Sequence, residues 1–151
     1  MDSGLATVDA VIQALYESTR HTREHPQDWE RFRSLFVPNA VLVQAASHGA
    51  YEYSIDSYIE EAQYFRDRDP TVEWYETEVA RQTHQLEDVA HVFSIYVHGP
   101  ATEHTQPKRY TNSFHLVKID EYQQHGTSFH QNMKWQITSW HWSAELPNDQ
   151  R

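Results

Sequence analysis

The main change in the spacing of apolar residues along this sequence comes at Pro70, from a mostly helical period to a strand period. Before Pro70, residues 8–24 and 54–66 repeat apolar side chains at i, i+3 and i+4, which makes one apolar stripe along a helix. After Pro70, four segments alternate apolar and polar residues, as half-buried strands do. Helices followed by strands predict an α+β protein, because parallel α/β sheets need the two kinds of element to alternate.

The helical half of the sequence carries recognisable stripes and caps. The first helix has an apolar stripe made of Val8, Val11, Ile12, Leu15, Tyr16 and Thr19. Ser54 or Asp56 can cap the third helix, because both side chains accept hydrogen bonds from the free N–H groups of a first turn. The elements predicted here are helices over residues 8–24, 25–36 and 54–66 and strands over 39–45 and 51–54.

The strand half ends in a segment crowded with tryptophan. The predicted strands cover residues 71–86, 89–98, 109–119 and 134–142, with a loop over 98–107 and a polar connection over 120–133. Strict alternation in the last strand places Trp135 on one face and Trp140 and Trp142 on the other. Both faces of this strand are therefore expected to be covered by other parts of the protein.

Length, charge and composition bound the class of protein. The 151 residues correspond to a single domain over 1–151. A net charge of −10 provides no basic footprint for nucleic acid, so no nucleic-acid partner is expected. No apolar run reaches the ~20 residues of a membrane span, and residues 1–10 lack the pattern of a signal peptide. A cytoplasmic protein without a membrane partner is predicted.

Two acidic residues in the first long strand are the predicted catalytic groups. Glu87 and Asp88 form a two-residue hairpin turn that sets residue 84 opposite 91, 80 opposite 95 and 78 opposite 97. In that register Glu76 and Glu78 lie on the more apolar face, beside Phe93, Ile95 and Val97. Desolvation disfavours the charged form of a carboxylate, so either acid can donate or accept a proton near neutral pH.

A structural interpretation of the same two acids stays open. Glu76 or Glu78 can lie at the rim of the sheet, solvated or paired with an arginine such as Arg66 or Arg68. A slip of one residue at the turn would also change their partners across the hairpin.

The histidines do not predict a metal site. His21 and His25 have the i, i+4 spacing of two ligands on one helical face, and His84 lies opposite His91 at the hairpin tip. A zinc site needs a third ligand, and neither pair has one in the pattern. No metal is therefore predicted, and a polar helix end and an exposed polar tip are the interpretations we favour.

Several aromatic residues are predicted to bind a small apolar or aromatic molecule. The predicted substrate-binding residues are Tyr16, Trp29, Tyr58, Phe93, Asn112 and Trp140. Small-molecule clefts are mostly apolar with a few polar groups, and Asn112 could orient a ligand carbonyl. Each of these residues could equally belong to an ordinary core, with Asn112 satisfying a neighbouring backbone group.

Motifs for nucleophilic, nucleotide and metal chemistry are absent. The sequence has no GxSxG, GxxxxGK[ST], GxGxxG or HExxH and no calcium-binding loop, and it has no cysteine. No cofactor is therefore predicted.

The order of elements and four segments resemble a known superfamily. DWERFRSLFVPNAVLV, WYETEVARQTHQLEDVAHVFSIYV, RYTNSFHLV and KWQITSWHW resemble segments of the nuclear transport factor 2-like superfamily, and are most similar to its bacterial SnoaL-like branch. Tyr110 and Glu87 stand where that branch often has glycine. The resemblance implies a cone-shaped, curved antiparallel sheet with the N-terminal helices on its concave side, a pocket inside, and a homodimer.

Two functions follow from the residues and the resemblance together. The first is a small-molecule pocket with acid–base isomerase, dehydratase or cyclase chemistry at Glu76 or Glu78. The second is a non-catalytic binding or dimerisation module whose cone is filled by its own side chains. The volume of the pocket would discriminate between them, and the substrate is not encoded in any pattern found here.

Overall fold

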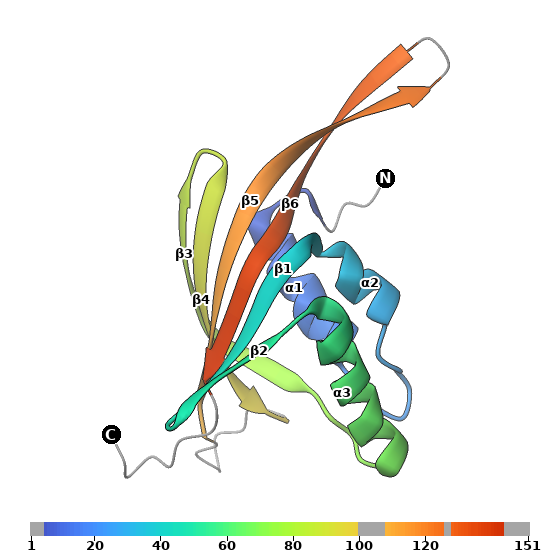
Figure 1. Cartoon of the computed structure of the whole chain (residues 1–151), viewed down its shortest axis with the longest axis vertical. Coiled ribbons are helices and arrows are strands. Elements are labelled where there is room, and N and C mark those ends of the chain that lie inside the picture. Colours follow the sequence, from blue (N-terminus) through green and yellow to red (C-terminus); the bar gives the residue numbers. More distant parts are fainter. Residues whose placement is uncertain (1–4, 100–107, 126–127, 144–151) are drawn as a thin grey trace.

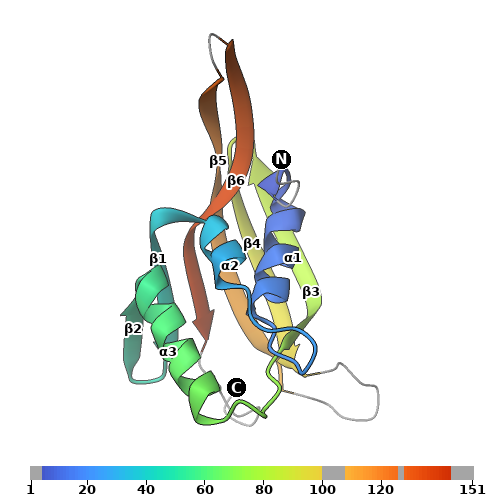
Figure 2. The ribbon, with the colours of Figure 1, turned by 90° about the vertical axis from the view of Figure 1, so that its right-hand side faces the viewer.

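A computed structural model describes residues 5–99, 108–125 and 128–143, in which helices cover one face of a curved sheet (Figures 1 and 2). The elements are α1 (Val8–Thr19), α2 (Trp29–Ser34), β1 (Phe36–Ala46), β2 (Gly49–Tyr53), α3 (Ile55–Arg68), β3 (Glu76–Leu86), β4 (Val89–His98), β5 (Tyr110–His125) and β6 (Ser128–Ser143). We call the face toward the helices the inner face and the opposite one the outer face. The predicted α+β class with helices on the concave side is confirmed.

The sheet has the order β2-β1-β6-β5-β4-β3, and its two edges do not pair with each other. The curved sheet is therefore open, and it does not close into a complete cone. Its pairs are antiparallel except for β1 with β6, which is parallel. The expectation of an all-antiparallel sheet was wrong at this pair. Parallel neighbours need a long crossover, and the chain from β2 through β5 supplies it.

Helix α1 is shorter than its apolar pattern predicts. The side chain of Thr7 caps its first turn by accepting from the N–H of Ala10 at 3.1 Å. All six residues of the predicted stripe are buried. The helix ends at Thr19 and not at residue 24, because the chain then turns into a short backbone bridge between His21 and Trp74. His21 and His25 therefore do not share a helical face.

Helix α3 begins where the sequence predicts, whereas α2 begins at Trp29 and ends at Ser34, inside its predicted range of 25–36. Asp28 accepts from the N–H of Arg31 at 3.0 Å, and Ser54 forms a reciprocal capping box with Ser57. Ser54 rather than Asp56 is therefore the cap of α3. This helix buries Ile55 and Ile59 against the sheet.

The β3–β4 hairpin follows the predicted register for most of its length and then departs from it. The turn at Glu87 and Asp88 is confirmed, with Glu87 at a φ of 52°. Pairing holds from the turn as far as Ala80 opposite Ile95. Val79 is then an extra residue, so Glu78 lies opposite Tyr96 and not opposite Val97 as predicted.

This β-bulge decides which face the two acids share. Before the bulge, Ala80 and Gln82 lie with Ile95 and Phe93 on the outer face. Because a bulge inserts one unpaired residue, the side chains beyond it exchange faces. Glu76 and Glu78 therefore do lie on one face, as predicted, but it is the inner face with Tyr96 and not the face with Ile95.

A second bulge lies in β6, at Thr138. His115 pairs with Ser139 and Leu116 pairs with Ile137, which leaves Thr138 unpaired, its hydroxyl donating to the carbonyl of His115 at 3.2 Å. The tryptophans on either side of it consequently face the same way. Trp135, Trp140 and Trp142 all belong to or pack against the core under the helices. The expectation that they divide between two faces was wrong, because it assumed strict alternation.

Strands β5 and β6 continue far beyond their predicted ends. Residues 120–133, predicted as a polar connection, pair across the hairpin from Asp120 with Met133 to His125 with Ser128. The paired strands project past the rest of the sheet (Figure 1). Among the described residues, no helix has the length and apolar character needed to cross a membrane.

Candidate functional site

A cavity of about 240 Å³ lies on the inner face where α3 approaches the sheet. Its lining residues come from α3, from five strands and from the segment before β3: Gln44, Tyr58, Trp74, Glu76, Tyr96, His98, Tyr110, Trp140, Trp142 and Ser143. Six of them are tyrosine or tryptophan. The ring of Tyr58 lies 5.3 Å from that of Trp140, and the ring of Tyr96 is stacked at 5.4 Å on that of Tyr110. We call this space the aromatic cavity.

Among the described residues, Glu76 is the one carboxylic acid that lines the aromatic cavity. Its side chain enters the cavity because the bulge at Val79 turns this end of β3 inward. The residue is 9% exposed. Burial raises the pKa of Glu76 from 4.5 to about 8, because the ionised form loses its hydration.

Tyrosine hydroxyls in the same cavity remain protonated. Burial, followed by the charge of Glu76, raises the pKa of Tyr58 and of Tyr96 above the ordinary value of a phenol. Both hydroxyls are therefore hydrogen-bond donors throughout the physiological range of pH. A carboxyl group that titrates near neutrality beside such donors can transfer a proton and stabilise a negative oxygen.

Glu78 lies on the same face in a different environment. Both of its carboxylate oxygens accept from Arg81, at 2.6 and 2.9 Å, and Ser94 donates to it as well. Arg81 also donates to Asp9 of α1 at 2.7 Å. The arginine partner is therefore Arg81 and neither Arg66 nor Arg68, and the ion pair joins β3 to α1.

A chain of buried hydrogen bonds continues from Glu78 across the inner face. The indole N–H of Trp140 donates to Asn112 Oδ1 at 2.9 Å, and Asn112 Nδ2 donates to the hydroxyl of Tyr16 at 3.0 Å. Tyr16 lies 2.5 Å from Ser94 Oγ. Since the single hydroxyl hydrogen of Ser94 goes to Glu78, Tyr16 is the donor to Ser94. Each group donates to the next, from Trp140 through Asn112, Tyr16 and Ser94 to Glu78. We call this series the hydrogen-bond chain.

A second cavity, of about 190 Å³, adjoins the aromatic cavity. Gln44, Tyr58, Trp74 and Trp142 line both of them. The second cavity also receives Glu61 and Arg66 from α3. The guanidinium of Arg66 lies 5.0 Å from the centre of the Trp74 ring, so we call this space the Arg66 cavity.

The predicted substrate-binding residues fall into three groups. Tyr58 and Trp140 line the aromatic cavity, as expected of pocket walls. Tyr16 and Asn112 belong to the hydrogen-bond chain. The other two predictions, Trp29 and Phe93, lie elsewhere.

Trp29 and Phe93 do not line either cavity. The indole N–H of Trp29 donates to Gln63 at 3.1 Å, and its ring packs against Phe32. Phe93 is 43% exposed on the outer face, in edge contact with His91. Phe93 was expected inside because the face of the hairpin that carries Phe93 and Ile95 was taken as the face toward the pocket, and it is the outer face.

Seven cavity residues were missed from the sequence: Gln44, Trp74, Tyr96, His98, Tyr110, Trp142 and Ser143. Simple alternation from Trp140 already places Trp142 on the same face, so that residue could have been found. Tyr96 and His98 could be placed only after the bulge at Val79 was known. Trp74 precedes β3, and its backbone pairs with His21 through two hydrogen bonds of 2.7 Å.

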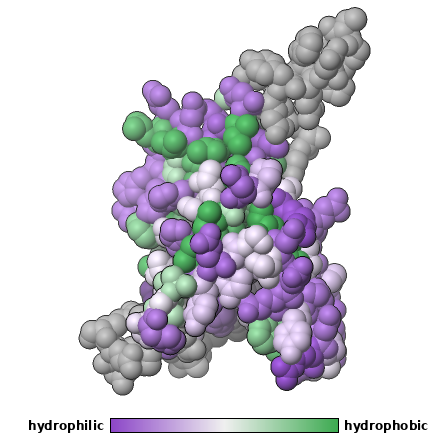
Figure 3. Space-filling view, viewed as in Figure 1, coloured by the Kyte–Doolittle hydropathy of each residue, from purple (hydrophilic) through white to green (hydrophobic). Residues whose placement is uncertain are grey.

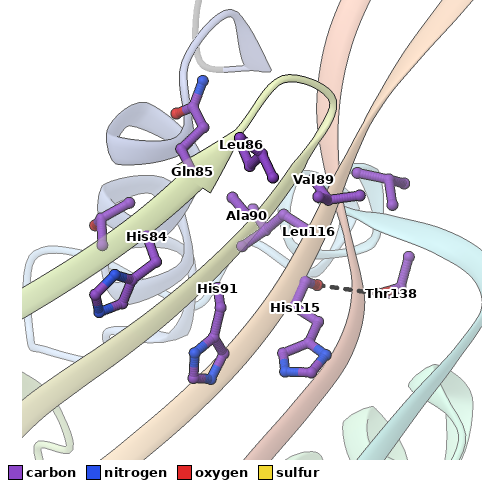
Figure 4. A pocket seen from close by; sticks show the side chains of 11 residues that line it. His84, Gln85, Leu86, Val89, Ala90, His91, His115, Leu116 and Thr138 are labelled. Carbon is purple, nitrogen blue, oxygen red and sulfur yellow. Dashed lines mark hydrogen bonds between the residues drawn. The ribbon is translucent and has the colours of Figure 1, made fainter.

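The hairpin tip carries a separate, open cavity of about 630 Å³ on the described part of the chain. His84 and His91 are opposite each other, as predicted, and His115 of β5 extends the row (Figure 4). Burial, then His115 and His84, lower the pKa of His91. No set of three ligands that could hold a metal ion occurs among the described residues.

Apolar side chains also gather at this tip, over the hairpin turn that joins β3 to β4 (Figure 3). Leu86 is 75% exposed and Val89 is 54% exposed. This surface and its histidine row are open to solvent, so they do not provide the desolvation that shifts the pKa of an acid or base. The aromatic cavity is therefore the candidate functional site.

No family model matches this sequence, and no curated protein matches it. Solved structures do match. A nuclear transport factor 2-like protein of unknown function from Pseudomonas putida has a TM-score of 0.60 at 14% identity, over 99% of this chain and 92% of that one. A proposed ketosteroid isomerase from Shewanella frigidimarina has a TM-score of 0.54 at 17% identity, over 94% and 96%.

A third similar structure has been proposed to be an enzyme. This proposed dehydratase of the nuclear transport factor 2-like family, from Streptomyces avermitilis, has a TM-score of 0.57 at 14% identity, over 97% of this chain and 99% of that one. Identities this low indicate a shared fold and carry no activity across. The open curved sheet and the helices on its concave side therefore give this chain the nuclear transport factor 2-like fold.

Proposed function

We propose that this protein binds a small, largely apolar or aromatic carbonyl compound in the aromatic cavity and that Glu76 exchanges a proton with it. The observation that supports this proposal best is the position of Glu76, a buried acid among six aromatic side chains. A carboxyl group with a pKa of about 8 holds its proton at neutral pH and can also give it up there.

The reaction class follows from what surrounds the acid. Ionised Glu76 would remove a proton next to the substrate carbonyl, and the hydroxyls of Tyr58 and Tyr96 would donate hydrogen bonds to the enolate oxygen. Returning the proton to another carbon gives isomerisation. Passing it to a β-hydroxyl, which then leaves as water while a carbon–carbon double bond forms, gives dehydration. The activities proposed for the two similar structures belong to these classes, as do those we expect from the resemblance to the SnoaL-like branch.

A non-catalytic binding module remains the second candidate, and the volume of the cavity favours it. At about 240 Å³ the aromatic cavity lies below the ~300–1,000 Å³ of ordinary ligand sites. Such a cavity suits a ligand of few atoms, and a cavity of this size is sufficient for a protein that binds its ligand without converting it. The predicted homodimer also remains a prediction, and light scattering of the purified protein would measure it.

Exchange of hydrogen for deuterium tests the catalytic proposal without knowledge of the product. The protein is incubated in D₂O with acetophenone, cyclohexenone and phenylacetone, and NMR follows the loss of the protons next to each carbonyl. We expect faster exchange than in buffer for at least one compound, with a rate that rises with pH and levels off above about 8.

The Glu76→Gln variant should exchange no faster than buffer, because the amide cannot accept the proton. Glu60→Gln is the matched control, since Glu60 is an exposed acid of α3 outside both cavities. Full activity of Glu76→Gln, or no exchange with any of the three compounds, would sink the catalytic proposal and leave the binding module.

A further inference from the structure

The Nε atom of Arg66 is buried without a hydrogen-bond partner, and among the described residues it is the one buried side-chain nitrogen or oxygen in that state. Buried polar groups in folded proteins almost always have partners, because a donor that loses its hydration without gaining a hydrogen bond lowers the stability of the fold. The Nε atom itself is inaccessible, but Arg66 also lines the Arg66 cavity, so an acceptor bound there can pair with the guanidinium when the side chain turns toward it. A bound ligand is the natural source of that acceptor.

The surroundings of Arg66 indicate what the ligand would contact next. The guanidinium lies over the Trp74 ring, and Trp74 separates it from the space that holds Glu76. Tyr58 and Trp142 complete an aromatic wall common to both cavities. A ligand that reaches the guanidinium therefore lies along aromatic rings, on which a flat ring can stack.

The charge of the Arg66 cavity is compatible with an anion. Glu61 is the acid that lines it, and Glu61 is already engaged in a hydrogen bond with the side chain of Tyr53. A guanidinium offers its N–H groups in a fork that matches the two oxygens of a carboxylate. A ligand carboxylate is therefore a better partner for Arg66 than a neutral carbonyl.

We propose that Arg66 binds the carboxylate of the ligand, so that the substrates of this protein are small aromatic carboxylic acids. The inference rests on the proposed function, because it takes one ligand to extend from the Arg66 cavity toward Glu76. The ring of the acid lies against the wall formed by Tyr58, Trp74 and Trp142. Its reactive end points toward Glu76.

Benzoate is the smallest member of this class, and benzamide is its uncharged match. Each is titrated into the protein while NMR follows the Nε–H signal of Arg66 and tryptophan fluorescence follows the aromatic wall. For so small a ligand we expect a benzoate dissociation constant on the order of 10 mM or lower. Benzamide should bind at least about tenfold more weakly, because it lacks the charge-assisted hydrogen bond.

Variants of two arginines of α3 distinguish specific recognition of the carboxylate by Arg66 from a general effect of positive charge on benzoate binding. Arg66→Gln should weaken benzoate binding about tenfold and leave benzamide unchanged. Arg68→Gln is the matched control, because Arg68 contacts Tyr64 and lines neither cavity. Arg66→Lys keeps the charge without the forked donors and should fall between the two. The NMR signal of the wild type provides the readout should a variant fail to fold.

Each outcome decides the inference. Equal binding of benzoate and benzamide, no benzoate binding up to about 100 mM, or a benzoate affinity unaffected by Arg66→Gln would overturn it. Should Arg66 recognise benzoate while no compound exchanges protons at Glu76, the carboxylate site stands and the catalytic proposal fails. Should Glu76 exchange protons while the protein shows no preference for carboxylates, the catalytic proposal stands and the carboxylate site at Arg66 fails.

Discussion

Glu76 and Glu78 are two residues apart on one strand and face the same side of the sheet, yet their surroundings are opposite. Glu78 has an arginine and a serine on its oxygens and lies at the end of the hydrogen-bond chain. Glu76 lies among aromatic rings, where burial raises its pKa to about 8. The polar groups around Glu78 have partners, whereas the cavity that adjoins that of Glu76 is lined by Arg66, whose Nε has none.

The difference separates structural from functional polar groups. A satisfied network fixes how two elements pack, and here it joins α1 to β3, β4, β5 and β6. A buried acid or donor without such a network lowers stability, and such groups cluster at sites that bind or react. Substitutions in the two regions should therefore change stability in opposite directions.

The largest expected effect is on the pH dependence of stability at Glu76. Its pKa of about 8 in the folded state lies above the 4.5 of the unfolded chain. The folded protein therefore keeps a proton that the unfolded chain releases, so the stability from this group is full below about 4.5 and is lost as pH rises through about 8. Between pH 5 and 9 we expect the wild type to lose roughly 4 kcal/mol relative to Glu76→Gln.

Urea denaturation at a series of pH values measures this difference. Comparing two variants at each pH cancels the titration of all other groups. Glu60→Gln should follow the wild type, since Glu60 is exposed. Parallel curves for the wild type and Glu76→Gln would show that Glu76 is not desolvated, and the contrast with Glu78 would disappear.

The second effect is a loss of stability when the hydrogen-bond chain is cut at its centre. Asn112 is fully buried and bonds to both Trp140 and Tyr16. Asn112→Ala leaves the indole N–H of Trp140 without an acceptor and creates a cavity. We expect a loss of about 3 kcal/mol in the free energy of unfolding.

Chemical denaturation checks this value against an exposed asparagine. Asn39→Ala, in an exposed part of β1, should change stability by no more than about 0.5 kcal/mol. A loss below about 1 kcal/mol for Asn112→Ala would mean that the chain adds little to the packing of α1, which would weaken the comparison from the structural side.

The smallest effect, with the opposite sign, is expected at Arg66. Arg66→Met removes the unmet donor and keeps an unbranched apolar stem, at the cost of the contact with Trp74. We expect the variant to be as stable as the wild type or more stable by up to about 1 kcal/mol. Thermal unfolding measures this, and a loss well above 1 kcal/mol would indicate that Arg66 has a structural role after all.

The periodicity of the sequence predicted the class of fold and most of its elements. The stripe of α1 is buried as expected, and the turn at Glu87 and Asp88 was located correctly. These predictions succeed because a stripe and a two-residue turn are local features. The parallel pairing of β1 with β6 joins residues about a hundred positions apart, and no local pattern encodes it.

The site was predicted less well, for a reason that lies in two residues. Val79 and Thr138 are residue types that favour regular strands, so their identity does not predict a bulge. Alternation therefore gave the wrong neighbours to Glu78 and divided the tryptophans of β6 between two faces. Glu76 was still chosen, since it and Glu78 change faces together, whereas Phe93 remained on the other side.

The bulge at Val79 has a consequence for how related chains should be compared with this one. In a chain that shares the fold but has a regular strand there, the acid equivalent to Glu76 would lie one position nearer the hairpin turn. Counting back from the turn without a gap would match Glu76 to a residue on the outside of the sheet. At identities of 14–17% the score of an alignment would hardly register that error. Superposed backbones, with a single-residue gap inside the strand, are therefore the sound way to ask whether other members carry this acid.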